Sequence, residues 1–82
     1  MYIIKKHYEA TDSNQNFAGE VKDYYEGKSG HQLIPPLGRW EIEEYGYRTI
    51  AAATRGLKAV QELCDWETSQ GFWKVSAELV EM

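Results

Sequence analysis

The densest group of side chains able to carry out chemistry is a run of three carboxylates, Glu41, Glu43 and Glu44. Two carboxylates held together in a pocket can divide the roles of general acid and general base. Glu41 and Glu43 would share one face of a strand, where they repel each other unless water or a cation screens them. A solvated sheet edge that discourages aggregation explains such a group most simply, and an acidic strip that mimics phosphate is the functional alternative.

The residues able to bind a metal or act as a nucleophile are dispersed along the chain. His7, His31 and Cys64 fall on a predicted strand, loop and helix, without the close spacing of a zinc site. Cys64 lies on the apolar side of the predicted helix, where a cysteine usually serves as a small buried hydrophobic residue. The segment Gly27-Lys28-Ser29-Gly30 lacks the upstream glycine and the following helix of a phosphate-binding loop. We therefore predict no catalytic residue, no metal site and no cofactor.

A second candidate site lies where the predicted helix begins. The free amides of a first helical turn attract anions, and Arg48 and the Thr49 hydroxyl stand beside them, with Tyr47 placed to stack on a ring. The helix charges are unusual, because cations occupy its first half and anions its second, which opposes the helix dipole at both ends. Drift is the first explanation of this arrangement, and an anion site is the functional one. The site it would form, for a phosphate or nucleotide, consists of Tyr47, Arg48, Thr49 and Arg55.

Hydrophobic periodicity predicts the elements that must position these residues. Alternation of side chains predicts strands over residues 2 to 9, 17 to 26 and 39 to 45. The polar run 11 to 16 predicts a hairpin loop, and residues 27 to 38, which include two prolines, predict an irregular connection lying on the core.

After Thr49, a suitable N-cap, the period changes to 3.6 residues and predicts a helix over 50 to 69. Its main apolar stripe is Ile50, Ala53, Leu57, Val60 and Cys64. A second stripe runs beside it through Ala52, Gly56, Ala59, Leu63 and Trp66, and we expect Leu63 and Trp66 to fill the gap between helix and sheet. Gly71 is placed to end the helix, and residues 72 to 81 alternate again as a last strand.

The expected fold is therefore one small α+β domain over residues 1 to 82, with elements in the order β-β-β-α-β and one helix on one face of an antiparallel sheet. The net charge of −4 disfavours direct binding to nucleic acid or to anionic membranes. The N-terminus lacks the apolar stretch of a signal peptide, and a single cysteine cannot form an internal disulfide, so we expect a cytoplasmic protein. At 82 residues there is little volume to spare for a substrate pocket, which disfavours an enzyme.

Several aromatic and acidic segments give the chain a general resemblance to a known group. They are Tyr24-Tyr25-Glu26, Trp40-Glu41-Ile42-Glu43-Glu44 and Gly71-Phe72-Trp73. In size, acidity, aromatic content and element order, the chain resembles small accessory proteins of phages and mobile elements, including anti-CRISPR and other anti-defence inhibitors. The resemblance implies a stoichiometric inhibitor that occupies a nucleic-acid-binding or effector surface, in the host cytoplasm if the gene is a phage gene. It transfers no functional residue.

Three hypotheses follow. The leading one is a non-enzymatic protein that binds another protein, with a basic surface, through Tyr24, Glu41, Glu43, Glu44, Glu62 and Asp65. The alternative is a small-ligand binder that uses the helix N-terminus. A third is a homodimer, since a small core rich in aromatic residues is often completed by pairing.

Overall fold

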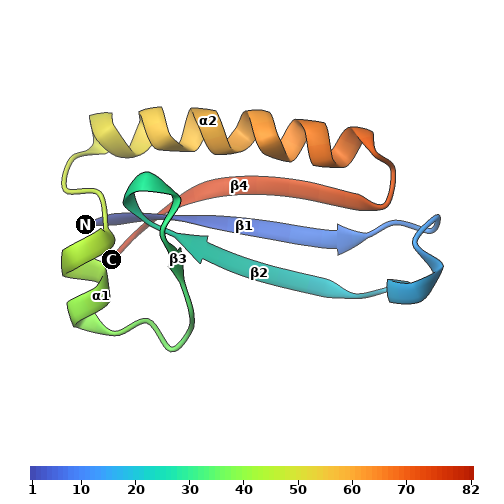
Figure 1. Ribbon diagram of the computed structural model, residues 1–82, viewed down its shortest axis with the longest axis horizontal. Coiled ribbons are helices and arrows are strands. Elements are labelled where there is room, and N and C mark those ends of the chain that lie inside the picture. Colours follow the sequence, from blue (N-terminus) through green and yellow to red (C-terminus); the bar gives the residue numbers. More distant parts are fainter.

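The computed structural model describes all 82 residues and consists of a four-stranded antiparallel sheet with one long helix lying along it (Figure 1). The strand order is β3-β2-β1-β4. The α+β class is confirmed. The strands are β1 (Tyr2–Ala10), β2 (Val21–Glu26), β3 (Gln32–Leu33) and β4 (Trp73–Glu81), the helices are α1 (Arg39–Tyr45) and α2 (Ile50–Ser69), and two 3-10 turns are η1 (Gln15–Phe17) and η2 (Lys28–Gly30).

Helix α2 occupies the residues that its periodicity predicted, and both of its ends have the expected physical cause. The Thr49 hydroxyl accepts a hydrogen bond from the Ala52 amide at 3.2 Å, which satisfies one of the free donors of the first turn. Gly71 follows the helix with φ of 89°, a left-handed conformation that glycine adopts without a steric penalty. The helix packs mainly on β4 and to a lesser extent on β1.

The core lies between α2 and this pair of strands. Ile4, Val60, Cys64 and Val75 form its buried cluster, with Tyr8, Tyr47 and Leu57 among the half-buried residues around it. None of the helices is both long and apolar enough to cross a membrane.

The expectation that Leu63 and Trp66 fill the gap between helix and sheet is wrong. Both side chains face solvent, with exposed fractions of 58% and 62%. The orientation of α2 about its own axis explains why these two side chains are exposed. The Thr68 hydroxyl bonds the amide and carbonyl of Val75 on the outer edge of β4, so the sector of the helix that contains Ala53, Val60 and Cys64 faces the sheet. The stripe through Leu63 and Trp66 is turned away from that sector.

Residues 39 to 45 form helix α1, so the predicted third strand is wrong at this position. A run of seven residues with alternating polarity is ambiguous, and glutamate favours helices over strands. Arg39 and Glu43, one helical turn apart, are joined by a 3.0 Å ion pair. The amide of Gly46 bonds the Ile42 carbonyl at 2.8 Å and closes the last turn.

The third strand, β3, lies within the predicted irregular connection and has only two residues. Pro35 and Pro36 follow it and have no amide hydrogen for a sheet ladder, so β3 cannot extend along β2. Leu33 is buried, as expected of this connection, whereas Ile34 is exposed.

Strand β2 begins at Val21 and not at residue 17 as predicted. The preceding residues form the η1 turn and a bend at Gly19, whose φ is 76°. Phe17 therefore leaves the strand, and its ring packs on Trp73 at a centroid distance of 5.6 Å.

The face of the sheet opposite α2 has its own small core at the end where both termini and α1 lie (Figure 1). Ile3 and Leu33 point to this face and are almost fully buried. At the same end, the ring of His31 stacks on Tyr45 with centroids 3.5 Å apart.

Gly56 provides a test of how closely α2 approaches the segment that precedes it. A Cβ atom at this position would collide with the hydroxyl of Tyr47. Alanine at a helical glycine usually stabilises by about 1 kcal/mol, but here we expect Gly56→Ala to destabilise the protein by about 1–2 kcal/mol, because the collision outweighs the propensity gain. Urea denaturation monitored by circular dichroism measures the change.

The matched control is the same substitution in a Tyr47→Ala background, where the obstacle is gone and Gly56→Ala should become stabilising. A stabilised Gly56→Ala single variant would show that the helix does not make this close approach.

A candidate binding groove

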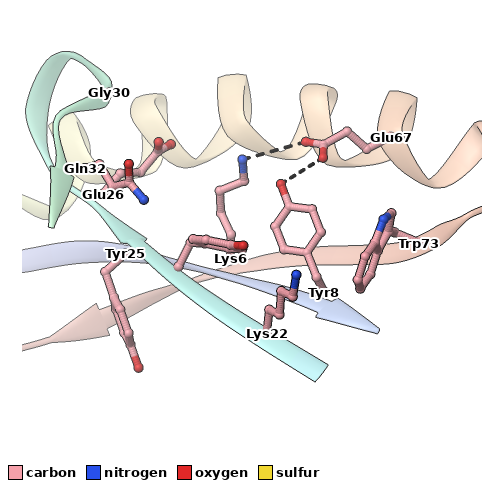
Figure 2. Close-up of a pocket in the computed structure, with 10 residues that line it drawn as sticks. Lys6, Tyr8, Lys22, Tyr25, Glu26, Gly30, Gln32, Glu67 and Trp73 are labelled. Atoms are coloured by element: carbon pink, nitrogen blue, oxygen red, sulfur yellow. Dashed lines mark hydrogen bonds and ion pairs between the residues drawn. The ribbon is translucent and has the colours of Figure 1, made fainter. Parts of the chain in front are cut away.

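The α2 side of the sheet is only partly covered. Register places Glu26, Tyr24 and Lys22 of β2 beside Ile4, Lys6 and Tyr8 of β1, so these side chains continue the same face beyond the helix. A cavity of about 430 Å³ opens there between α2, β2 and the η2 turn (Figure 2). We call it the groove. Its lining consists of Lys6, Tyr8, Lys22, Tyr24, Tyr25, Glu26, Gly30, Gln32, Glu67 and Trp73.

A polar network joins the helix to the floor of the groove. One Glu67 oxygen accepts a hydrogen bond from the Tyr8 hydroxyl at 2.8 Å, and the other lies 3.7 Å from the Lys6 ammonium (Figure 2). The Lys6 and Glu67 side chains are only 17% and 29% exposed, so solvent screens this pair less than a surface ion pair.

The network also shifts the titration of its members. Burial by itself lowers the pKa of Lys6, but the neighbouring Tyr8, Glu67 and Glu26 outweigh it, so the pKa lies above its ordinary value. Burial is the main cause that raises the pKa of the Tyr8 hydroxyl, and its hydrogen bond to Glu67 acts in the same direction. Lys6 therefore stays charged and Tyr8 neutral near pH 7, and both are engaged with Glu67.

Aromatic rings line the end of the groove beside β4. The ring of Tyr8 makes edge-to-face contacts with Tyr24 and Trp73, at centroid distances of 5.2 and 6.0 Å. The Lys22 ammonium lies 4.7 Å from the ring centroid of Phe17 and 5.4 Å from that of Trp73. Rings that contact one another in this way are rigid and offer flat apolar surface to a partner.

The flank of α2 extends this apolar surface out of the groove. Leu63 lies one helical turn before Glu67 and therefore on the same side of the helix, and Ala59 lies one turn before Leu63. Trp66 stands next to Glu67 and further out. Leu63, Trp66 and Tyr24 are all exposed, so the groove and its wall together form an apolar patch that the chain itself does not cover.

The cations inside the groove are already matched by carboxylates. Lys6 faces Glu67, and Lys22 lies 3.3 Å from Glu20. Glu26 makes no ion pair. The two lysines of the lining are therefore paired, and its aromatic rings offer apolar surface beside these polar groups.

Cys64 is the one cysteine of the chain. Burial raises the pKa of the Cys64 thiol, so this buried residue stays protonated and is a poor nucleophile. No three of the histidine, cysteine, aspartate and glutamate side chains lie close enough together to hold a metal ion.

The predicted protein-binding residues are not brought together. Tyr24 lines the groove, whereas Glu62 and Asp65 lie on the outer surface of α2. Glu41, Glu43 and Glu44 belong to α1 and do not line the groove. The expectation of an acidic strip on a strand is therefore wrong, because residues two apart, such as Glu41 and Glu43, share a face of a strand but point to nearly opposite sides of a helix.

In the predicted site at the start of α2, two of the four residues already have partners within the chain. The Thr49 oxygen is engaged by the Ala52 amide, and Tyr47 packs against the core and against Gly56. Burial raises the pKa of the Tyr47 hydroxyl, and Glu26 adds to the effect. Arg48 and Arg55 are exposed and make no ion pair.

Sequence reasoning missed Lys6, Tyr8 and Glu67 as a group. One signal was present: Lys6 is a charged residue among Tyr2, Ile4 and Tyr8 on the apolar face of its strand. Its partner, 61 positions later on another element, has no local signature in the sequence.

Comparison of the chain with protein-family models, with curated proteins and with solved structures gives no match.

The opposite face of the sheet carries one further titratable cluster. Nδ1 of His7 lies 2.6 Å from Asp23 and Nε2 lies 3.1 Å from Glu9. Hydrogen bonds to Asp23 and then to Glu9 raise the pKa of His7 above its ordinary value.

Replacing Glu67 by glutamine tests the network at the floor of the groove. The substitution keeps the shape of the side chain but leaves the Lys6 ammonium without its counter-charge, so we expect a loss of about 1–3 kcal/mol in the free energy of unfolding. Urea denaturation at pH 7 measures it. Glu44→Gln, at an exposed position of α1 without an ion pair, is the matched control and should change stability by less than about 0.5 kcal/mol. Equal effects of the two substitutions would contradict a structural role for the network.

The His7 cluster predicts a pH dependence of stability. Because the folded-state pKa is raised above the unfolded value of about 6.5, the contribution of His7 is fully present below that pH and is lost as pH rises through the folded pKa. Asp23→Asn should therefore lower the His7 pKa in an NMR titration and reduce the difference in stability between pH 5.5 and 8.5. Asp12→Asn, in the exposed loop, serves as the control; if it acted as strongly as Asp23→Asn, the cluster would not be the cause.

Proposed function

We propose that this chain is a small non-enzymatic protein-binding module, and that its groove accepts apolar side chains of another protein. One observation carries the proposal: Leu63 and Trp66 are exposed beside a groove whose aromatic rings are already held in place. Isolated exposed apolar residues are common on proteins, but a contiguous patch next to a concavity is typical of an interaction site.

The composition of the patch supports binding to a protein over binding to an ion or a nucleic acid. Tyrosine and tryptophan are the residues that contribute most to protein interfaces, because they bury large areas at a low cost in conformational entropy. Tyr8 contacts both Tyr24 and Trp73 at the groove. The groove cations are already paired with carboxylates, which leaves them poorly placed to neutralise phosphates.

A narrower form of the proposal follows from the resemblance to anti-defence proteins. In that form the partner is a host effector or a nucleic-acid-binding protein, and the module inhibits it by occupying its surface in a fixed stoichiometry. The partner would place its apolar anchors in the groove and leave α1 free.

The binding role is tested by comparing wild type with Leu63→Ser and Tyr24→Ala as baits in a lysate of the natural host. A partner that depends on the groove should be captured by wild type and lost with both variants. Titration with the purified partner by calorimetry should then show a fixed stoichiometry and at least a tenfold weaker Kd for each variant, since loss of an interface anchor costs about 1.4 kcal/mol or more.

Two control variants make this test specific. Ile34→Ser removes an equally exposed apolar side chain that does not line the groove, and Glu41→Lys with Glu44→Lys changes the acidic surface of α1. Both should bind like wild type. Loss of binding in the α1 variant, with Leu63→Ser unaffected, would move the interface from the groove to the acidic residues of α1.

A further inference from the structure

The outer surface of α2, which faces away from the sheet, carries a regular pattern of charge. Arg55, Lys58, Glu62 and Asp65 are separated by three, four and three residues, so they form one stripe along the helix. All four are exposed. None of them makes an ion pair, even though Lys58 and Glu62 are one turn apart.

Within a single chain this pattern has no partner. The two cations lie in the half of α2 nearer the helix N-terminus and the two anions in the half nearer its C-terminus. The groove does not use these residues, and no neighbouring element pairs with them. Water solvates these exposed charges in the isolated chain, so they are free to pair with charges of another molecule.

A second copy of the same helix supplies it when the two helices run antiparallel. If the two-fold axis passes at the level of Val60, whose own side chain faces the core, each residue of the stripe lies opposite the residue of the second copy whose number brings the sum to 120. Arg55 then lies opposite Asp65 of the second copy, and Lys58 lies opposite Glu62 of the second copy. The stripe is thus complementary to itself, with four opposite-charge pairs in one symmetric register. A parallel arrangement would instead place like charges together.

The same register places Ala51 opposite Ser69 of the second copy, so small side chains meet at both ends of the stripe. Trp66, which is 62% exposed, lies beside the stripe at the level of Arg55 of the second copy, where its ring can stack on the guanidinium.

We infer that the outer face of α2 is a homodimer interface, in which two copies pair antiparallel about a two-fold axis at Val60. The sheets lie on the outside of this dimer. Both grooves remain open, and both face the same side of the helix pair, because the two-fold axis is perpendicular to the plane of the helices. The inference does not depend on the proposed function of the groove.

The charge pattern permits a swap experiment. Glu62→Lys with Asp65→Lys gives a stripe of four cations, and Arg55→Glu with Lys58→Glu gives a stripe of four anions. Each double variant should remain folded by circular dichroism, since the positions are exposed, and should be monomeric by sedimentation equilibrium at concentrations where wild type dimerises. Mixing the two variants should restore a dimer that contains one copy of each. A chain that carries all four substitutions should dimerise with itself like wild type.

Salt dependence and a matched control complete the test. Raising the salt from about 0.05 to 0.5 M should weaken the wild-type dimer by about tenfold or more, because the paired charges are exposed. Glu41→Lys with Glu44→Lys makes the same change in net charge on α1 and should leave the dimer intact. A monomeric wild type, dimers of either double variant alone, or no mixed dimer would each overturn the inference.

Discussion

One helix cannot cover a four-stranded sheet, and the surface of this protein follows from that constraint. A helix with its side chains is about 10 Å wide, whereas the outer strands of four are about 14 Å apart before their own side chains are counted. Helix α2 lies on β4 and β1, so β2 and β3 have no cover on that side. The chain has no second helix to place there, because α1 is short and lies beside the termini (Figure 1).

Charged residues lie at the boundary between the part of the sheet that α2 covers and the part that it leaves open. Lys6 and Glu67 lie where the apolar core ends, and each is partly shielded from water, so a charge on one requires the opposite charge on the other. Tyr8 belongs to both the core and the groove, because its ring packs against the core and its hydroxyl donates a hydrogen bond to Glu67. The groove thus has a polar floor that holds the helix in position and aromatic sides that remain available.

The rotation of α2 about its axis assigns a role to each of its faces. Thr68 bonds the free edge of β4 on one side and Glu67 bonds Tyr8 on the other, and together they fix that rotation. Ala53, Val60 and Cys64 consequently enter the core, Leu63 borders the groove, and the stripe of Arg55, Lys58, Glu62 and Asp65 faces outward. A rotation of about 100° would expose the core residues, and it would bury Asp65 in one direction or Leu63 and Trp66 in the other. The groove and the charged stripe are therefore separate surfaces of one helix.

Local chemistry was enough to predict α2, its cap at Thr49, its end before Gly71 and the long strands β1 and β4, because helical and strand periods differ clearly over nine or more residues. It was not enough for residues 39 to 45, where seven residues fit either period, or for the start of β2, where a turn interrupts the alternation after Phe17. The sequence also contained the charge pattern of α2, since that depends only on spacing along one element. Tertiary structure alone decided that Leu63 and Trp66 face solvent and that Lys6, Tyr8 and Glu67 meet. The reason is physical: which side of an amphipathic helix is buried depends on the width and position of the sheet beneath it, and contacts between residues about 60 positions apart have no local signal.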